Sequence, residues 1–88
     1  MVMVTFPLAT MVTPVAWTWN YRVLKHGAEY AIHEVYYDGP VPHSCSEQPA
    51  APLGLYSPED LRRDMEMMLR AFDYPVLNYD DFNREPLA

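Results

Sequence analysis

The stretch that decides the fold reads WTWNYRVLKHGAEYAIHEVYYD and spans residues 17–38. In its first part, Trp17–Lys25, large apolar side chains alternate with polar ones, and this period of two is typical of a half-buried strand. Its second part, Glu29–Tyr37, is equally rich in residues that favour strands. Between the two parts His26-Gly27 signals a tight turn, because glycine readily adopts a positive φ. The sequence therefore predicts a β-hairpin.

The segment that follows, residues 40–58, is rich in proline, which indicates that much of it is loop. Within it, His43–Gln48 lacks proline and predicts a short third strand on the free edge of the hairpin. A two-stranded hairpin alone is marginally stable in water, and this favours the third strand.

A helix is predicted to begin at Ser57, where the hydroxyl can cap and Pro58 suits the first helical position. The helix ends by Tyr74, because Pro75 disfavours helical backbone in the residue before it. Apolar side chains fall on one helical face and are expected to pack against the sheet. They are Leu61, Met65, Met68, Leu69 and Phe72.

Together these elements predict a single α+β domain over residues 17–82, in which one amphipathic helix packs on a face of a small antiparallel sheet. The expected order is the two strands of the hairpin, the short third strand and then the helix, β-β-(β)-α. Both faces of the hairpin carry large side chains, so the sequence does not decide which face the helix covers. Residues 83–88 are expected to form a frayed tail.

Residues 1–16 are uncharged and largely apolar. They lack the basic region of a signal peptide and are too short to span a bilayer. Two interpretations stay open for them, an edge strand of the domain and an apolar leader that precedes it.

The balance of charge narrows the class of partner. The 88 residues include 12 acids against 6 lysines and arginines, a formal net charge of −6. Direct binding to nucleic acid or to an anionic membrane is disfavoured, whereas a protein with a basic surface is attracted. Cys45 is the only cysteine, so no internal disulfide can form and a reducing cytoplasm is the expected location.

The residues that could carry out chemistry do not form a recognisable catalytic set. His33 and Glu34 are adjacent in a strand, so their side chains point to opposite faces and cannot act as a pair. A nucleophilic Cys45 would need a nearby cation or a helix N-terminus, and the sequence offers His43 and the start of the helix at Ser57. We therefore expect no enzyme activity and no cofactor, with chemistry at Cys45 as the exception.

A zinc site can be imagined from three histidines and the cysteine, but their spacing matches no structural zinc motif. We expect no bound metal. A small metal- or ligand-binding domain that uses His43 and Cys45 remains the second alternative function.

Several segments resemble a group of short, uncharacterised bacterial and prophage proteins. The likeness is carried by Trp19–Val23 (WNYRV), Ala31–Asp38 (AIHEVYYD), Asp64–Leu69 (DMEMML) and Pro75–Asp81 (PVLNYDD), and covers about residues 17–82. The resemblance implies a bacterial or phage-infected cytoplasm and carries over no catalytic residue.

Aromatic and acidic side chains supply the expected contact surface. Aromatic residues crowd the hairpin, and tyrosine and tryptophan commonly anchor protein interfaces. The C-terminal part of the domain combines acids with aromatic rings, a combination suited to a basic patch. The predicted contact residues are Asp73, Tyr74, Tyr79, Asp80, Asp81 and Phe82 together with Trp19 and Tyr36.

The leading hypothesis is therefore a non-enzymatic, acidic protein-interaction module that occupies a basic surface of a protein partner. The phage-like resemblance extends this to an inhibitor of a host defence or nucleic-acid-handling complex, of the anti-CRISPR kind. The alternative is a self-associating structural or adaptor protein, a homodimer paired through the hairpin aromatics.

Overall fold

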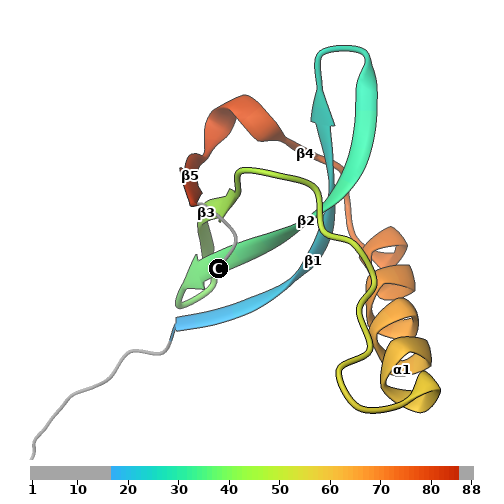
Figure 1. Cartoon of the computed structure of the whole chain (residues 1–88). Helices are drawn as coiled ribbons and strands as arrows, with labels where there is room; N and C mark the ends of the chain where they lie inside the picture. Colours follow the sequence, from blue (N-terminus) through green and yellow to red (C-terminus); the bar gives the residue numbers. More distant parts are fainter. Residues whose placement is uncertain (1–16, 86–88) are drawn as a thin grey trace, which may run out of the picture.

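The computed structural model describes residues 17–85, which form an α+β domain with one five-stranded sheet and one α-helix (Figure 1). The strands lie in the order β4-β1-β2-β3-β5. The predicted fold class is confirmed, and the sheet is larger than predicted. The interpretations of residues 1–16 as leader or edge strand fall outside the described residues. The strands are β1 (Trp17–His26), β2 (Glu29–Asp38), β3 (Val41–Ser46), β4 (Leu77–Asn78) and β5 (Asn83–Glu85).

The hairpin is the centre of the sheet. Strands β1 and β2 pair antiparallel from Trp17 opposite Asp38 to His26 opposite Glu29. Gly27 closes the turn with φ 62°, a conformation that costs little only without a Cβ atom. Both the hairpin and its turn agree with the sequence prediction.

The third strand, β3, pairs antiparallel with the free edge of β2. It begins two residues before the predicted start, and the register shifts between Tyr36 and Tyr37, so that Pro42 lies opposite Tyr37. A bulge of this kind accommodates proline, which has no N–H group to donate to a neighbouring strand.

The last two strands come from the C-terminal segment and pair in parallel, β4 with β1 and β5 with β3. Residues 83–85 were expected to fray and instead form β5, whose Glu85 carbonyl accepts a 2.7 Å hydrogen bond from the Glu47 N–H. The edge of β3 offers unpaired backbone groups, and the passing chain satisfies them. Residues 86–88 of the expected tail lie outside the described residues.

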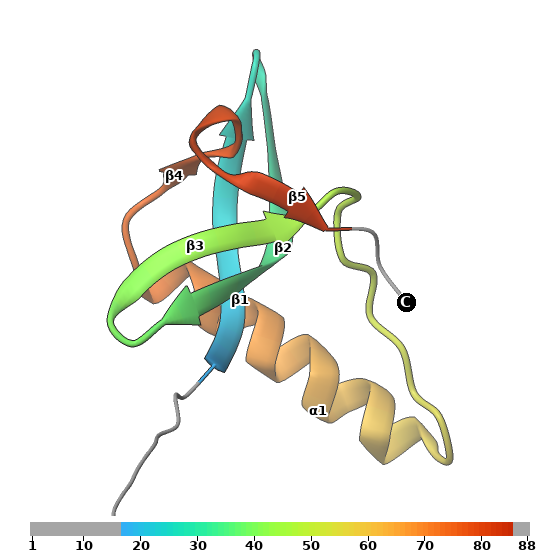
Figure 2. The same cartoon turned by 90° about the vertical axis from the view of Figure 1, so that its left-hand side faces the viewer.

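The curled sheet is covered on both faces (Figures 1 and 2). One face presents Tyr21 and Val23 to the helical segment, where Met68 and Ala71 complete the first core cluster. The opposite face carries Leu24, Val35 and Cys45, and Tyr79 from the short 3-10 helix η2 (Tyr79–Asp81) completes the second core cluster. The alternation of the hairpin thus serves two cores, and the helix covers the Tyr21 face.

Helix α1 (Pro58–Leu69) starts as the sequence predicts, with the Ser57 hydroxyl accepting a 3.2 Å hydrogen bond from the Asp60 N–H. It continues into the 3-10 turn η1 (Arg70–Asp73) and ends before Pro75.

The expected packing face of α1 is wrong for most of its apolar stripe. Only Met68 is buried; Leu61, Met65, Leu69 and Phe72 are 38%, 53%, 67% and 66% exposed. The side of α1 that faces the sheet carries Asp64 instead, because this carboxylate accepts a hydrogen bond from the phenol of Tyr21 on the sheet.

Candidate functional site

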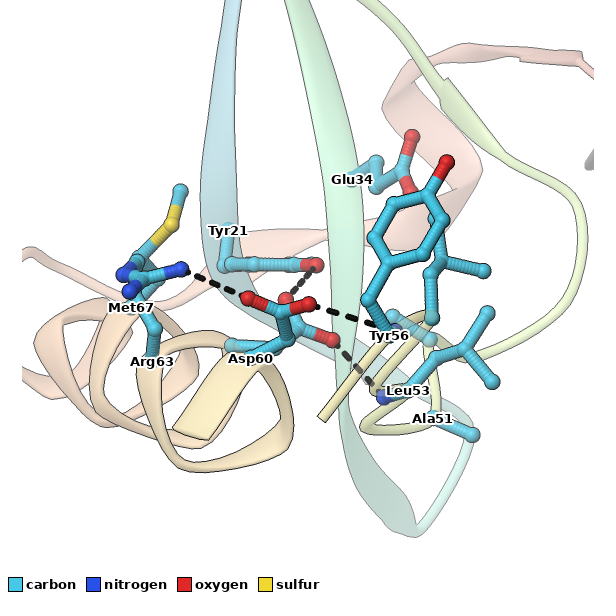
Figure 3. Close-up of a pocket in the computed structure, with 11 residues that line it drawn as sticks. Tyr21, Glu34, Ala51, Leu53, Tyr56, Asp60, Arg63 and Met67 are labelled. Atoms are coloured by element: carbon cyan, nitrogen blue, oxygen red, sulfur yellow. Dashed lines mark hydrogen bonds and ion pairs between the residues drawn. The ribbon is translucent and has the colours of Figure 1, made fainter. Parts of the chain in front are cut away.

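The candidate site is a hollow of about 570 Å³ between the Tyr21 face of the sheet, the loop before α1 and the first turns of that helix (Figure 3). We call it the acidic hollow, because three carboxylates line it. Its lining comprises Tyr21, Glu34, Ala50, Ala51, Leu53, Leu55, Tyr56, Asp60, Arg63, Asp64 and Met67.

Asp64 holds the three walls of the acidic hollow together. Its Oδ1 accepts a 2.6 Å hydrogen bond from the Tyr21 hydroxyl, and its Oδ2 accepts a 2.9 Å bond from the Leu53 N–H. Burial and the neighbouring carboxylate of Asp64 raise the pKa of Tyr21, so the phenol stays protonated and keeps donating. One carboxylate on the helix thereby positions both the sheet and the loop.

Two further carboxylates are fixed at the edges of the acidic hollow. Asp60 accepts hydrogen bonds from the Tyr56 N–H at 3.2 Å and from the Arg63 guanidinium at 2.9 Å (Figure 3). Glu34, on β2, accepts a 2.6 Å bond from the Tyr36 hydroxyl. Burial and this bond to Glu34 raise the pKa of Tyr36 to about 12, so the tyrosine remains a donor at neutral pH.

The acidic hollow combines negative charge with apolar walls. Its carboxylates outnumber its one guanidinium, that of Arg63, whose side chain is 68% exposed. Alanine, leucine and methionine side chains form the rest of the lining, and the ring of Tyr56 is 91% exposed. An aliphatic chain that ends in a cation fits this environment, because its stem packs on apolar atoms while its head pairs with carboxylates.

Two of the predicted contact residues belong to the core. Tyr79 is 8% exposed, its hydroxyl donates a 3.0 Å hydrogen bond to the Glu47 carbonyl, and its ring stacks on His26 at 4.2 Å. Phe82 packs partly buried against the same cluster. Their expected role as surface contacts is corrected. The second face of the sheet is apolar, and these two rings bury it, which the sequence analysis did not predict.

The other predicted contact residues do not form one surface. Asp73 ends η1 on the helix side of the sheet, whereas Asp80 and Asp81 lie in η2 over the opposite face. Trp19 and Tyr36 line a separate hollow on the hairpin. The expected acidic edge is thus divided between the two faces of the molecule.

Tyr74 is half-exposed and lies 4.9 Å from the guanidinium of Arg22. Arg22 is buried and donates 2.8 Å hydrogen bonds to the Tyr37 hydroxyl and the Pro75 carbonyl. It therefore ties the segment after η1 to the sheet. The alternation in Trp17–Lys25 predicts that Arg22 lies on the polar side of the hairpin. In the structure this side is the face of the second core cluster.

The residues considered for catalysis and metal binding are placed apart. Cys45 is fully buried, and burial raises the pKa of its thiol, with a smaller opposing effect of Arg84. A buried thiol with a raised pKa is a poor nucleophile. Over residues 17–85 no three histidine, cysteine or acidic side chains gather as metal ligands would, so His26, His33, His43 and Cys45 do not form such a group.

His33 makes stability depend on pH. It is buried, and its Nδ1 lies 2.9 Å from the Ser46 carbonyl, so this nitrogen carries the proton and donates. Burial lowers the pKa of His33 below its usual 6.5. Below pH 6.5 the unfolded chain therefore takes up a proton that the folded chain resists, and the free energy of unfolding falls with pH.

We expect this loss between pH 6.5 and the lower pKa of folded His33, with a slope of at most about 1.4 kcal/mol per pH unit for one proton. Urea unfolding at several pH values, compared between the wild type and His33→Gln, isolates the contribution. The curves should converge as the pH falls. Parallel curves would show that His33 titrates alike in both states.

Comparison of the chain with protein-family models, with curated proteins and with solved structures finds no match. The fold and the site define the class of this protein as a small α+β domain with an acidic hollow between sheet, loop and helix. Of the part of the chain that the structure describes, no helix has the length and apolar character needed to cross a membrane.

Proposed function

We propose that this protein is a non-enzymatic interaction module that binds a basic segment of a protein partner in the acidic hollow. The observation that supports it most directly is the arrangement of Glu34, Asp60 and Asp64 around apolar walls with a single arginine among them. A lysine or arginine side chain finds there both an anion and a surface for its aliphatic stem.

The overall charge supports the same class of partner. A net charge of −6 attracts basic proteins from a distance, and the acidic hollow supplies a defined place for one side chain to enter. The proposal includes inhibition of a nucleic-acid-handling complex, of the anti-CRISPR kind, since a basic segment held by this chain is no longer available to phosphate groups.

A binding measurement tests the proposal with a matched pair of variants. Fluorescence anisotropy of a labelled peptide of alternating arginine and leucine reports affinity at low and at high salt. Glu34→Gln should weaken binding about tenfold, the effect of losing about 1.4 kcal/mol from a charge-assisted contact. The amide keeps the shape of the side chain and can still accept from Tyr36.

Asp81→Asn is the control, because it removes the same charge from an exposed position on η2, outside the acidic hollow. It should change the affinity less than about twofold. Equal weakening by both variants would mean that the peptide senses only net charge, and the assignment of the site would fail. A circular dichroism spectrum of each variant confirms that both remain folded.

A further inference from the structure

The outer side of α1 carries an apolar surface that nothing in residues 17–85 covers. Leu61, Met65 and Leu69 follow one another at spacings of four residues, and each is at least 38% exposed. We call these three residues the outer stripe. Together with Pro58, Arg62 and Glu66 they border a groove of about 450 Å³. Apolar side chains left exposed and bordered by charged residues are typical of protein contact sites.

We propose that a second copy of this chain covers the outer stripe, with the two α1 helices packed antiparallel about a two-fold axis at Met65. This register places Leu61 of one copy opposite Leu69 of the other, because both lie four residues from the axis. Met65 then meets its own equivalent at the centre. Apolar side chains thus meet apolar side chains along the whole contact.

The charges beside the groove fit a second copy. Arg62 and Glu66 lie on the same flank of the outer stripe, and a two-fold axis brings the same flanks of two antiparallel helices together. Arg62 lies three residues before the axis, and Glu66 of the other copy lies level with a point one residue before it. The offset between them along the helix is about 3 Å at 1.5 Å per residue.

Both members of this pair are available for it. Within residues 17–85 the ion pair on α1 joins Arg63 to Asp60, and neither Arg62 nor Glu66 takes part in one. A two-fold contact therefore forms two complementary pairs, one on each half, in spite of the negative net charge of each copy. A purely basic partner would gain nothing from Arg62.

Self-association by this route leaves the acidic hollow accessible. Asp60, Asp64 and Met67 line the hollow, and at 100° per residue they lie about 100° to 160° around α1 from Met65, the centre of the outer stripe. The dimer would therefore present two acidic hollows and could bind a partner with two basic segments more tightly than one copy can. The pairing itself does not depend on the proposed function.

Cysteine cross-linking of the full chain tests the contact and its register. The native Cys45 is fully buried and does not interfere. Met65→Cys places two thiols at the two-fold axis, and oxidised glutathione should link them at least about tenfold faster than thiols introduced off the contact. Arg63→Cys is the matched control, exposed on the hollow side of the same helix.

A charge exchange tests the partner more strictly. In analytical ultracentrifugation the wild type should sediment as a dimer, and Arg62→Glu should shift it to monomer by bringing like charges together. Adding Glu66→Arg to that variant should restore the dimer, which no general loss of stability would do. A monomeric wild type, or equal cross-linking at positions 63 and 65, would overturn the proposal in favour of another occupant of the stripe.

Failure of this contact can be told apart from failure of the acidic hollow. Met65→Lys should abolish the dimer and leave the affinity for the arginine-leucine peptide within about twofold, because Met65 does not line the hollow. Glu34→Gln should do the reverse.

Discussion

Tyr79→Ala is expected to lower the free energy of unfolding by about 3–5 kcal/mol, the range for truncating a buried aromatic side chain. Tyr79 covers the second core cluster, which it completes with Leu24, Val35 and Cys45. It also holds the Glu47 carbonyl through its hydroxyl. A domain of this size has about 5–10 kcal/mol of total stability, so the loss is a large fraction of it.

Urea denaturation followed by circular dichroism measures the effect, and the chain provides its own control. Tyr56→Ala is the same substitution at a tyrosine that is 91% exposed, and it should change stability by less than about 0.5 kcal/mol. Tyr79→Phe keeps the ring and removes only the hydrogen bond to Glu47, at a cost of about 1 kcal/mol. If Tyr79→Ala cost no more than Tyr56→Ala, η2 would not be packed on the sheet.

The elements that the sequence predicted correctly are those with a local signal. The alternation from Trp17 to Lys25 and the turn at Gly27 specify the hairpin, whose paired residues all lie within about ten positions of the turn. Ser57 and Pro58 specify the start of α1. In each case the signal lies within the element or directly beside it, so the inference needs no knowledge of distant contacts.

The parts that were missed depend on distant contacts. Strands β4 and β5 have two and three residues, too few to show a period, and each pairs in parallel with a strand far back in the chain. Tyr79 looks like a surface tyrosine because acids follow it, and only the curl of the sheet shows what it covers. The C-terminal segment therefore belongs to the domain for reasons that the sequence alone does not display.

The acidic hollow was missed for a related reason. Asp64 and Tyr21 are 43 residues apart, and in the sequence Asp64 looks like one more solvated acid on a charged helix. A partial signal was present: the turn at Gly27 fixes the register, and that register places Glu34 directly opposite Tyr21. A carboxylate and a phenol on one face of the sheet could have been predicted, whereas the approach of the loop and helix could not.

Gly54→Ala is expected to lower the free energy of unfolding by about 1–3 kcal/mol, as overpacking a tight contact does. A Cβ atom on Gly54 would lie 2.8 Å from three atoms at the start of α1, namely the carbonyl oxygen of the N-cap Ser57 and the N and Cβ atoms of Leu61. Two of these are backbone atoms and cannot rotate away. Either the loop or the start of the helix must therefore move.

The sign of this effect is what makes the substitution informative. Where alanine fits, replacing glycine stabilises a protein by about 0.4–1 kcal/mol, because the unfolded chain loses freedom. A loss of stability at Gly54 therefore means that the loop is held against α1, and the same displacement should break the Leu53–Asp64 hydrogen bond and weaken peptide binding in the acidic hollow. Leu55→Ala, at an exposed position of the same loop, should change stability by less than about 0.5 kcal/mol. A gain in stability from Gly54→Ala would place the loop away from the helix, and the acidic hollow would then lack the wall on which its affinity for a basic side chain depends.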